Sequence, residues 1–255
     1  MNCPVCQASA PFLWSKQILG KYPANYHRCG DCGYTFIPSP TWLEEAYASA
    51  LNVYDTGVLE RNLRLRAIVS NWMRWGLPAE AKALDYSGGY GVFVRLMRDL
   101  GFDFLWQDRY AQNILARGFE HRGEKVDLLT CFEVLEHIEK PREFMRELRS
   151  LSPHLILSTE LVPENLTPDW WYLGPEHGQH IGFHTPRSLT ILAESIGLRV
   201  VSHGSWHLLA EKPMPKWAWT LLCRVSKLLG ATRAKSTRIS ATRDSENLLI
   251  EFTRQ

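Results

Sequence analysis

Residues Ala83–Asp108 read ALDYSGGYGVFVRLMRDLGFDFLWQD, and this stretch decides the fold. It opens with a short apolar run, turns through the glycine-rich segment Ser87–Gly91, and continues with a helical pattern over Val92–Leu100. A second apolar run, Phe104–Trp106, leads to the acid Asp108. This pattern is typical of a nucleoside-binding half of a doubly wound sheet, which consists of a strand, a glycine turn, a helix and a second strand, with an acid about 20 residues after the turn.

The glycine turn is suited to holding a ligand against bare backbone. Gly88, Gly89 and Gly91 have no Cβ atom and accept positive φ, so the chain can turn sharply after the strand. The helix that follows points its N-terminus at such a ligand. Asp108 is expected at the carboxyl end of the next strand, which is where ligands bind in open α/β sheets. We therefore expect a cofactor at this edge of the sheet.

Further apolar segments extend the predicted sheet. Val126–Cys131 and His154–Thr159 read as buried strands. Strands that alternate with helices across residues 82–205 predict a parallel sheet with right-handed crossovers. Two final strands are expected at Arg199–Ser205 and Asn247–Phe252.

With this turn, this acid and the segment FEVLEH at Phe132–His137, the sequence resembles the class I S-adenosylmethionine-dependent methyltransferases. The resemblance covers roughly residues 80–255. It implies an α/β fold with a doubly wound, seven-stranded, Rossmann-like sheet whose last strand is reversed. The family's turn is usually Asp-x-Gly-x-Gly-x-Gly, whereas this chain reads DYSGGYG from Asp85, with Ser87 at the first glycine position.

The resemblance also implies the cofactor S-adenosylmethionine and the residues that bind it. Asp108 matches the acid that holds the ribose, and the loop after the Val126–Cys131 strand matches the region around the methionine half. Glu120, at the end of a short expected third strand, is a candidate contact for the adenine. The expected cofactor residues are Asp85, Ser87, Gly88, Gly89, Gly91, Asp108, Phe132 and Glu133.

Four cysteines near the N-terminus form two Cys-x-x-Cys pairs, Cys3 with Cys6 and Cys29 with Cys32, separated by 22 residues. Two such pairs can bring four thiolates around one tetrahedral zinc ion. Disulfides are the alternative, but residues 1–10 do not resemble a signal peptide, and a reducing cytoplasm favours metal. Because four cysteines fill the coordination shell, we expect a structural zinc in a small zinc ribbon that performs no chemistry.

These patterns divide the chain into three parts. A zinc-binding module is expected over residues 1–40, a helical cap or linker over 41–80, and an S-adenosylmethionine-binding domain over 81–255. No run approaches the roughly 18 apolar residues that span a bilayer. A cytoplasmic enzyme is therefore expected.

A basic stretch lies near the C-terminus. Residues 212–243 contain eight basic and no acidic side chains, although the formal net charge of the chain is only +2. Within it, KWAWTLLCRVSKLL at Lys216–Leu229 has apolar residues at helical spacing between cations, the pattern of a basic amphipathic helix. Such a helix can lie at a membrane surface, pack on the sheet, or cover a phosphate-bearing acceptor. Because the stretch lies between the last two expected strands, it is predicted to be an insertion.

Residues 169–185 combine aromatic, histidine and acidic side chains in a pattern that suits neither a helix face nor a strand. Such a mixture is typical of a functional loop. His180 is the candidate general base, because a neutral imidazole can accept a hydroxyl proton. The neighbouring aromatic side chains can stack on a sugar. His177 and His184 are expected to bond within the loop, and His137 to orient it.

The segment His180–Phe183 is similar to one in sugar-nucleotide C-methyltransferases and related glycan-modifying methyltransferases, some of which also begin with a four-cysteine zinc module. Those C-methyltransferases usually carry a further C-terminal domain, whereas this chain ends where the fold is expected to close. We therefore expect O-methylation of a sugar, sugar nucleotide or glycan.

Two other functions stay open at this stage. Some RNA methyltransferases also join a zinc module to this fold, and residues 212–243 could track phosphates. Nucleic acid is nevertheless not the expected partner, because Lys16, Lys21 and Arg28 are the only cations of the first 40 residues. A non-enzymatic scaffold is the third reading, and Ser87 in the glycine turn is its one support.

Overall fold

The computed structural model describes residues 1–48, 55–235 and 239–252. Part of the predicted 41–80 linker and Arg238 of the basic stretch lie outside the described residues. None of the helices in the described ranges combines the length and apolar character that crossing a bilayer requires. The chain divides into two compact units. The first unit contains Met1–Asn52, Phe132–Ser150 and Leu157–Pro213, and the second contains Val53–Cys131, Leu151–Ile156 and Met214–Gln255.

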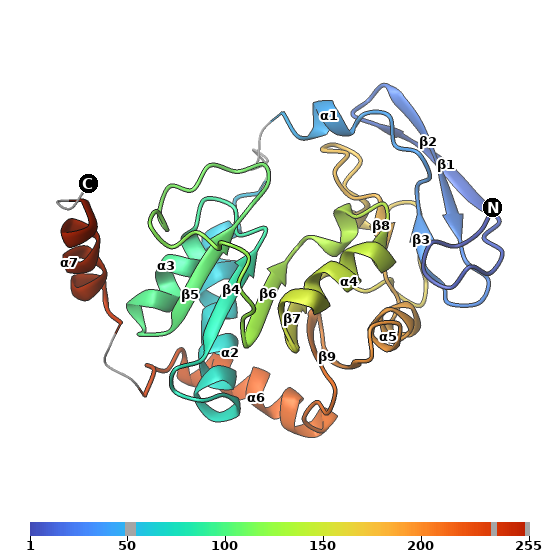
Figure 1. Cartoon of the computed structure of the whole chain (residues 1–255). Helices are drawn as coiled ribbons and strands as arrows, with labels where there is room; N and C mark the ends of the chain where they lie inside the picture. Colours follow the sequence, from blue (N-terminus) through green and yellow to red (C-terminus); the bar gives the residue numbers. More distant parts are fainter. Residues whose placement is uncertain (49–54, 236–238, 253–255) are drawn as a thin grey trace. The chain divides into compact units, whose positions relative to one another are not determined.

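An antiparallel sheet with strand order β1-β2-β3-β8 begins the first unit (Figure 1). β1 (Phe12–Ile18) and β2 (Tyr22–Arg28) form a hairpin, and β2 also pairs with β3 (Thr35–Phe36). β8 (Gly182–Phe183) comes from far along the chain and pairs with β3. The predicted small N-terminal ribbon is thus an antiparallel hairpin region, and the residues that follow His180 complete its sheet.

Aromatic side chains from both ends of this unit form its core. The rings of Tyr26 in β2 and Phe183 in β8 stack with centroids 6.1 Å apart. Trp42, next to the short helix α1 (Leu43–Ala46), donates from its indole to the Gly178 carbonyl at 2.7 Å. The N-terminal residues therefore pack around the loop 169–185, the predicted functional loop.

The other elements of the first unit include short helical turns and one capped helix. η1 (Leu135–His137) and α4 (Pro141–Leu151) follow the strand β6, and η2 (Trp171–Leu173) lies within the loop 169–185. α5 (Pro186–Glu194) begins with a capping box in which the side chains of Thr185 and Ser188 bond to each other's backbone N–H. This cap fixes the end of the segment that carries His180.

In the second unit, β4 (Lys82–Tyr86) pairs in parallel with β5 (Asp103–Gln107) on one side and with β6 (Leu128–Phe132) on the other. α3 (Val92–Asp99) connects β4 to β5, and it packs on β5 and on α2 (Val58–Gly76). The predicted order of strand, glycine turn, helix and strand is confirmed.

The larger sheet is mixed and has the order β5-β4-β6-β7-β10-β9. β7 (His154–Ser158) matches the predicted strand, and β9 (Arg199–His203) forms an antiparallel hairpin with β10 (Trp206–Ala210). The α/β Rossmann-like fold is therefore confirmed. The predicted count of seven strands is wrong for the described residues, because the expected third strand is reduced to one bridge between Trp106 and Glu120.

The prediction of a last strand at Asn247–Phe252 is also wrong, since these residues belong to the helix α7 (Ala241–Phe252). A buried ion pair fixes this helix within the second unit. Asp244 is 3% exposed and accepts two bonds of 2.8 Å from the guanidinium of Arg98. The reversed strand that the family resemblance implies is β10, whose apolar residues follow a tight turn at 204–205.

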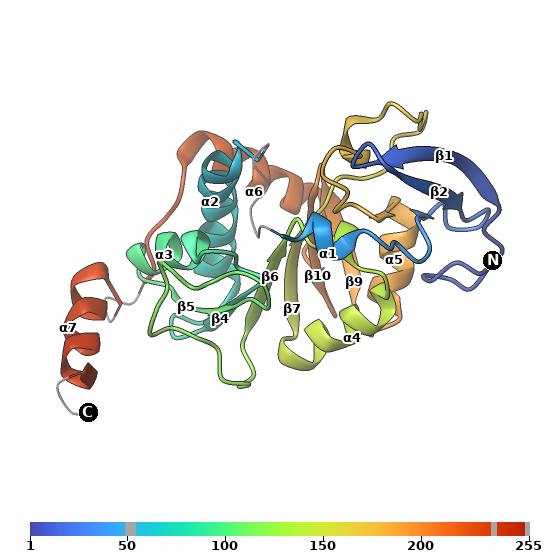
Figure 2. The same ribbon diagram turned by 90° about the horizontal axis from the view of Figure 1, so that it is seen from above.

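The basic stretch consequently follows the sheet and does not interrupt it, which corrects the predicted insertion at 212–243. The amphipathic helix is confirmed with its predicted bounds as α6 (Lys216–Leu229). Figure 2 shows α6 beside α2, against which it packs. Trp219 and Cys223 are buried, whereas Trp217 and Leu228 are exposed by 71% and 84%. The helix therefore has two apolar faces, and only one of them is covered by the described residues.

Candidate functional site

The glycine turn follows β4 and leaves part of its backbone open. Ser87, Gly89 and Gly91 have φ angles of 60°, 54° and 84°, in the left-handed region that only glycine enters freely. A Cβ atom on Gly89 would meet no described atom within 4 Å, so a ligand can approach this backbone closely. Ser87 stands where the family pattern has glycine, and it adopts the conformation that glycine would have.

Asp108 follows β5 directly and is bonded to the turn. Its Oδ2 accepts the N–H of Gly89 at 2.9 Å, and its Oδ1 accepts the N–H groups of Tyr110 and Ala111, both at 2.7 Å. The indole of Trp106 donates to the Gly89 carbonyl at 2.8 Å. The structure thus brings the predicted turn and the predicted acid together. Oδ2 accepts only one of these bonds, so it keeps a second lone pair that can accept a ribose hydroxyl.

Asp85 is a buried acid in β4 that supports the turn. Its side chain accepts a hydrogen bond of 2.7 Å from the Thr130 hydroxyl. Burial raises the pKa of Asp85 to about 7, and the negative charge of Asp108 acts in the same direction. A Cβ atom on Gly88 would lie 2.8 Å from the Asp85 carboxylate, so the absence of a side chain there lets the turn pass close to it.

Phe132 ends β6, and Glu133 follows it in the left-handed conformation with φ of 54°. Ser158, at the end of β7, holds Glu133 in place. The Glu133 N–H donates to the Ser158 carbonyl at 3.0 Å, and the Ser158 hydroxyl donates to the Glu133 carboxylate at 2.5 Å. A residue held in a sparsely populated conformation by its neighbours is common at functional sites.

Glu136, His137 and His180 come together within the first unit, and we call them the Glu–His cluster. One carboxylate oxygen and one nitrogen of each imidazole lie within 4.8 Å of one another. Tyr172 connects the acid to one of the histidines. Its hydroxyl donates to Glu136 Oε1 at 2.6 Å, and its carbonyl accepts from His180 Nδ1 at 2.6 Å. The Tyr47 hydroxyl lies 2.7 Å from His137 Nδ1.

Burial controls the protonation of the cluster. It raises the pKa of the Glu136 carboxyl to about 8, and the charge of Glu133 acts in the same direction. Burial also lowers the pKa of His137 to about 4 and that of His180 well below its usual value, and in both cases a neighbouring histidine adds to the effect. Both imidazoles are therefore neutral at neutral pH.

The other two histidines of the loop have bonding partners of their own. His177 Nδ1 accepts the N–H of Gln179 at 3.1 Å, and its ring centroid lies 4.6 Å from that of His180. His184 is fully buried against the Tyr34 ring, and burial lowers its pKa to about 3. Both positions suit the bonding roles expected from the sequence.

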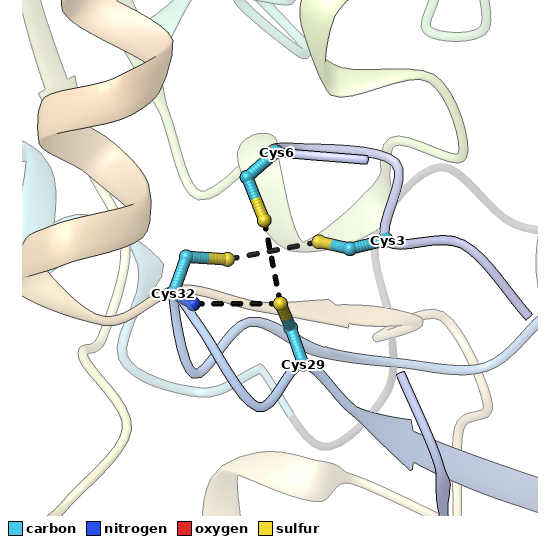
Figure 3. Close-up of side chains that lie close together, drawn as sticks. All are labelled: Cys3, Cys6, Cys29 and Cys32. Atoms are coloured by element: carbon cyan, nitrogen blue, oxygen red, sulfur yellow. Dashed lines mark hydrogen bonds between the residues drawn. The ribbon is translucent and has the colours of Figure 1, made fainter. Parts of the chain in front are cut away.

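The four N-terminal cysteines direct their sulfur atoms toward one another (Figure 3). The sulfurs of Cys3 and Cys32 are 3.6 Å apart and those of Cys6 and Cys29 are 3.3 Å apart, far longer than the roughly 2.05 Å of a disulfide. A tetrahedral zinc ion with Zn–S bonds of about 2.3 Å holds its sulfurs about 3.8 Å apart. The Cys32 N–H also donates to Cys29 Sγ at 3.4 Å. The donor set and its spacing therefore fit zinc.

Backbone hydrogen bonds tie the cysteine region to the Glu–His cluster. The Ile37 N–H donates to the Ile181 carbonyl at 2.9 Å, and the Ile181 N–H donates to the Glu136 carbonyl at 2.8 Å. The Thr185 hydroxyl donates to the Cys32 carbonyl at 2.5 Å. The residues that follow His180 are thus held by the hairpin region that the cysteines close.

Sequence reasoning did not assign a role in the site to Glu136, Tyr172 or Tyr47. The spacing Glu-x-x-Glu-His over residues 133–137 could have indicated the first of them, because a turn of helix after a strand brings such side chains together. Tyr172 was visible only as one of several aromatic residues in the loop. Tyr47 comes from the predicted linker, and no local pattern connects it to His137.

The sheet order and the bonded pair of turn and acid place the chain in the class of Rossmann-like, S-adenosylmethionine-dependent methyltransferases. Residues 59–203, more than half of the chain, match the family described as "Methyltransferase domain". The chain belongs to this methyltransferase family. No curated protein matches the whole sequence significantly.

Several solved methyltransferase structures are similar to this chain. CalO1, a methyltransferase in calicheamicin biosynthesis in its SAH-bound form, shares 16% identity over 61% of this chain and 56% of its own, with a TM-score of 0.45. Magnesium protoporphyrin IX methyltransferase from Synechocystis PCC 6803 with bound SAH shares 16% identity over 67% and 94%, with a TM-score of 0.41. Human N-acetylserotonin methyltransferase in complex with SAM shares 13% over 68% and 66%, with a TM-score of 0.42. The match thus spans little more than half of the CalO1 chain.

Proposed function

We propose that this methyltransferase acts on a hydroxyl group of a sugar, a sugar nucleotide or a glycan, including phosphate-bearing acceptors. The observation that carries the proposal is the tautomer of His180. Its Nδ1 lies 2.6 Å from the Tyr172 carbonyl, which can only accept, so Nδ1 carries the proton. Nε2 is then the nitrogen with a lone pair, and it is the atom that can take the proton of an acceptor hydroxyl.

The side chains around His180 suit a carbohydrate ring. The Tyr172 ring lies 4.5 Å from the imidazole and 5.2 Å from the Trp171 indole, measured between centroids. Trp171 is 73% exposed, so its face is available to a ligand. Aromatic faces bind the apolar faces of sugars, while imidazole and carboxylate groups bond to their hydroxyls. Within the first unit, the exposed Trp171 contacts Tyr172, and Tyr172 in turn contacts the candidate base His180.

S-adenosylmethionine supplies a methyl group that its sulfonium already activates. We propose that the predicted residues hold it, with open backbone at Gly89 and with ribose hydroxyls on Asp108. With the cofactor bound, the acceptor hydroxyl would give its proton to His180 Nε2 and an electron pair to the methyl carbon, and the carbon–sulfur bond would break with its pair left on sulfur. Alignment contributes roughly 7–11 kcal/mol in favourable systems, and a general base contributes about 10²–10⁴-fold.

The test combines cofactor binding with an acceptor screen. We expect calorimetric titration to show micromolar binding of S-adenosylmethionine, and labelled methyl transfer to some sugar nucleotides or glycans. The His180→Ala variant should keep cofactor affinity and lose turnover. Transfer to carbon or nitrogen atoms only, or full turnover by this variant, would overturn the proposal.

We also propose a structural zinc ion on Cys3, Cys6, Cys29 and Cys32, in keeping with the donor geometry. Metal analysis of the purified protein should find one zinc per chain at these thiolates. A Cys29→Ser variant should lose it. Protein that is fully folded without any metal would contradict this assignment.

We propose further that α6 holds the enzyme at an anionic membrane surface. Trp217, Leu221, Val225 and Leu228 recur at helical spacing and are all exposed. The cations of the helix lie next to them, and the surrounding stretch has no acid. Vesicles that contain phosphatidylserine should therefore sediment the protein, while neutral vesicles should not. A Trp217→Ser and Leu228→Ser double variant should stay in solution.

RNA as the acceptor gains no support from the hairpin region. Lys21 is paired with Glu45 at 2.8 Å, and Lys16 donates to the Pro168 carbonyl, so these cations have protein partners. A steep decline of RNA affinity with salt would revive this function. The scaffold reading has lost its one support, because Ser87 keeps the conformation of the glycine that it replaces.

A further inference from the structure

We infer that the Glu–His cluster, formed by Glu136, His137 and His180, binds a divalent transition-metal ion. One oxygen and two nitrogens from these side chains lie within 4.8 Å of one another, close enough to coordinate one ion after small rotations. All three belong to the first unit, and backbone bonds on either side fix the segments that carry them. This site is separate from the four cysteines.

The two imidazoles are held as metal-binding imidazoles usually are. His180 bonds through Nδ1 to the Tyr172 carbonyl at 2.6 Å, and His137 Nδ1 lies 2.7 Å from the Tyr47 hydroxyl. A histidine ligand commonly donates one ring N–H to a carbonyl or another oxygen, which orients the ring and leaves the second nitrogen for the metal. Nε2 of His137 lies 3.9 Å from Glu136 Oε1. In both rings, Nε2 is thus the candidate donor.

Glu136 provides an independent observation that points to a ligand. Its side chain is fully buried, and Oε1 accepts the Tyr172 hydroxyl at 2.6 Å. Oε2 is buried too and has no hydrogen bond of acceptable geometry to a described residue, although the Thr159 hydroxyl lies near the carboxylate. An unsatisfied buried carboxylate oxygen is costly, so native structures normally supply a donor or a cation. A metal ion at the two imidazoles would satisfy it.

The local charge also favours a cation. Glu133 is close enough to Glu136 that the Tyr172 hydroxyl bonds to both, at 3.3 Å and 2.6 Å. In the described part of the chain, neither acid forms an ion pair with a lysine or an arginine. Two neighbouring acids without a basic partner repel each other in a buried site. A divalent ion would favour the ionised form of both carboxylates.

The donor set indicates which ions fit. Two imidazoles with one carboxylate suit Fe²⁺, Mn²⁺, Co²⁺ or Zn²⁺ better than Mg²⁺ or Ca²⁺, which prefer oxygen ligands. Three protein ligands leave coordination positions open, unlike the four thiolates of a structural site. On the function proposed above, an acceptor hydroxyl could occupy one of them, and the ion would lower its pKa. His180 would then serve as a ligand, and the ion would replace it in activating the hydroxyl.

Cobalt titration of the full-length protein tests the site without cofactor or acceptor. The protein is first saturated with one equivalent of zinc to fill the cysteines, and Co²⁺ is then added. We expect one further equivalent to bind with d–d absorption and without thiolate-to-cobalt charge transfer. His180→Ala and Glu136→Gln should lose this spectrum, Tyr47→Phe should weaken affinity by about 10-fold, and the control His203→Asn should bind like the wild type.

Circular dichroism and retained zinc establish that each variant is folded, and the near-isosteric Glu136→Gln change keeps an acceptor for Tyr172. Absence of the cobalt spectrum in the folded wild type would overturn the inference and leave a proton, not a cation, on Glu136 Oε2. An unchanged spectrum in both ligand variants would do the same. Failure to methylate any sugar would overturn the proposed function alone, because cobalt binding requires no acceptor.

Discussion

The glycine turn at residues 87–91 offers a ligand mainly backbone groups, whereas the Glu–His cluster offers side-chain atoms. In the turn, Asp108 accepts three N–H bonds, so its position is fixed before any ligand arrives. In the cluster, Glu136 Oε2 is left without a partner among the described residues. The first arrangement is suited to recognition and the second to chemistry, since reactive atoms need unused bonding capacity. Changes in the two regions should therefore affect different measured constants.

The largest effect is expected from removing the zinc ion that we propose at the four cysteines. Structural zinc sites contribute about 10–16 kcal/mol to folding in small domains. In a Cys29→Ser variant, the hairpin sheet that includes β8 should unfold, and His180 should lose its position. Methyl transfer should then fall by more than about 10²-fold, since misplacement of about 1 Å already costs that much. The glycine turn lies in the other unit, so calorimetry should still find cofactor binding.

If the Cys29→Ser variant lost cofactor affinity as strongly as methyl transfer, the glycine turn and the Glu–His cluster would not be independent of each other. The matched control is Cys223→Ser, which changes a buried thiol in α6 that lies outside the four-cysteine cluster. That variant should keep its zinc and its activity.

The next largest effect is expected for His180→Ala. Loss of this side chain, the proposed base and a proposed ligand of the activating ion, should lower kcat by about 10²–10⁴-fold and leave the cofactor Kd within about two-fold. Steady-state kinetics with a labelled methyl donor measures the first, and calorimetry the second. His203→Asn is the control, because this histidine lies in β9 and is not a member of the cluster. A raised KM with unchanged kcat would instead assign His180 to acceptor binding.

The glycine turn and the Glu–His cluster also differ in how far the sequence could predict them. The turn and its acid lie within 26 consecutive residues, so the spacing alone reveals them. The cluster comes from residues 136–137 and 180 and its two bonded tyrosines from residues 47 and 172, and only tertiary packing brings these together. The sequence predicts His180 from its unusual loop and His137 as a residue that orients this loop, but it assigns no role to Glu136, Tyr172 or Tyr47. The predicted last strand at Asn247–Phe252 is wrong because its apolar residues alone do not reveal the buried ion pair between Asp244 and Arg98. This long-range pair holds the helix α7 in place.

A smaller effect is expected for Asp108→Ala. Loss of a charged hydrogen-bond acceptor costs roughly 1.5–3 kcal/mol, which corresponds to about 10–100-fold in cofactor Kd. Because the carboxylate also accepts the N–H groups of the turn, Asp108→Asn should lose less than alanine. Calorimetry measures both, and kcat at saturating cofactor should change by less than about five-fold. A fall in kcat without a change in Kd would move Asp108 from recognition to chemistry.

The smallest effect concerns the pH dependence of stability at Asp85. Its pKa is raised from the ordinary 3.8 to about 7 by burial and by Asp108, so the folded state favours the protonated carboxyl. The resulting stabilisation is complete below the unfolded pKa and is lost as the pH rises toward 7. An Asp85→Asn variant removes this loss. The free energy of unfolding of the variant, relative to that of the wild type, should therefore be higher at pH 8 than at pH 5 by about 1–2 kcal/mol.

Urea unfolding of both proteins at the two pH values measures this difference. Asp169→Asn is the control, because its side chain is 97% exposed and should give the wild-type pH dependence. If Asp85→Asn instead loses stability at pH 8, the ionised carboxylate contributes to the turn through its bond from Thr130. The conformation of the turn around Gly89 would then depend on a buried negative charge as well as on backbone bonds. In this respect the glycine turn would resemble the Glu–His cluster, which also contains a buried acid.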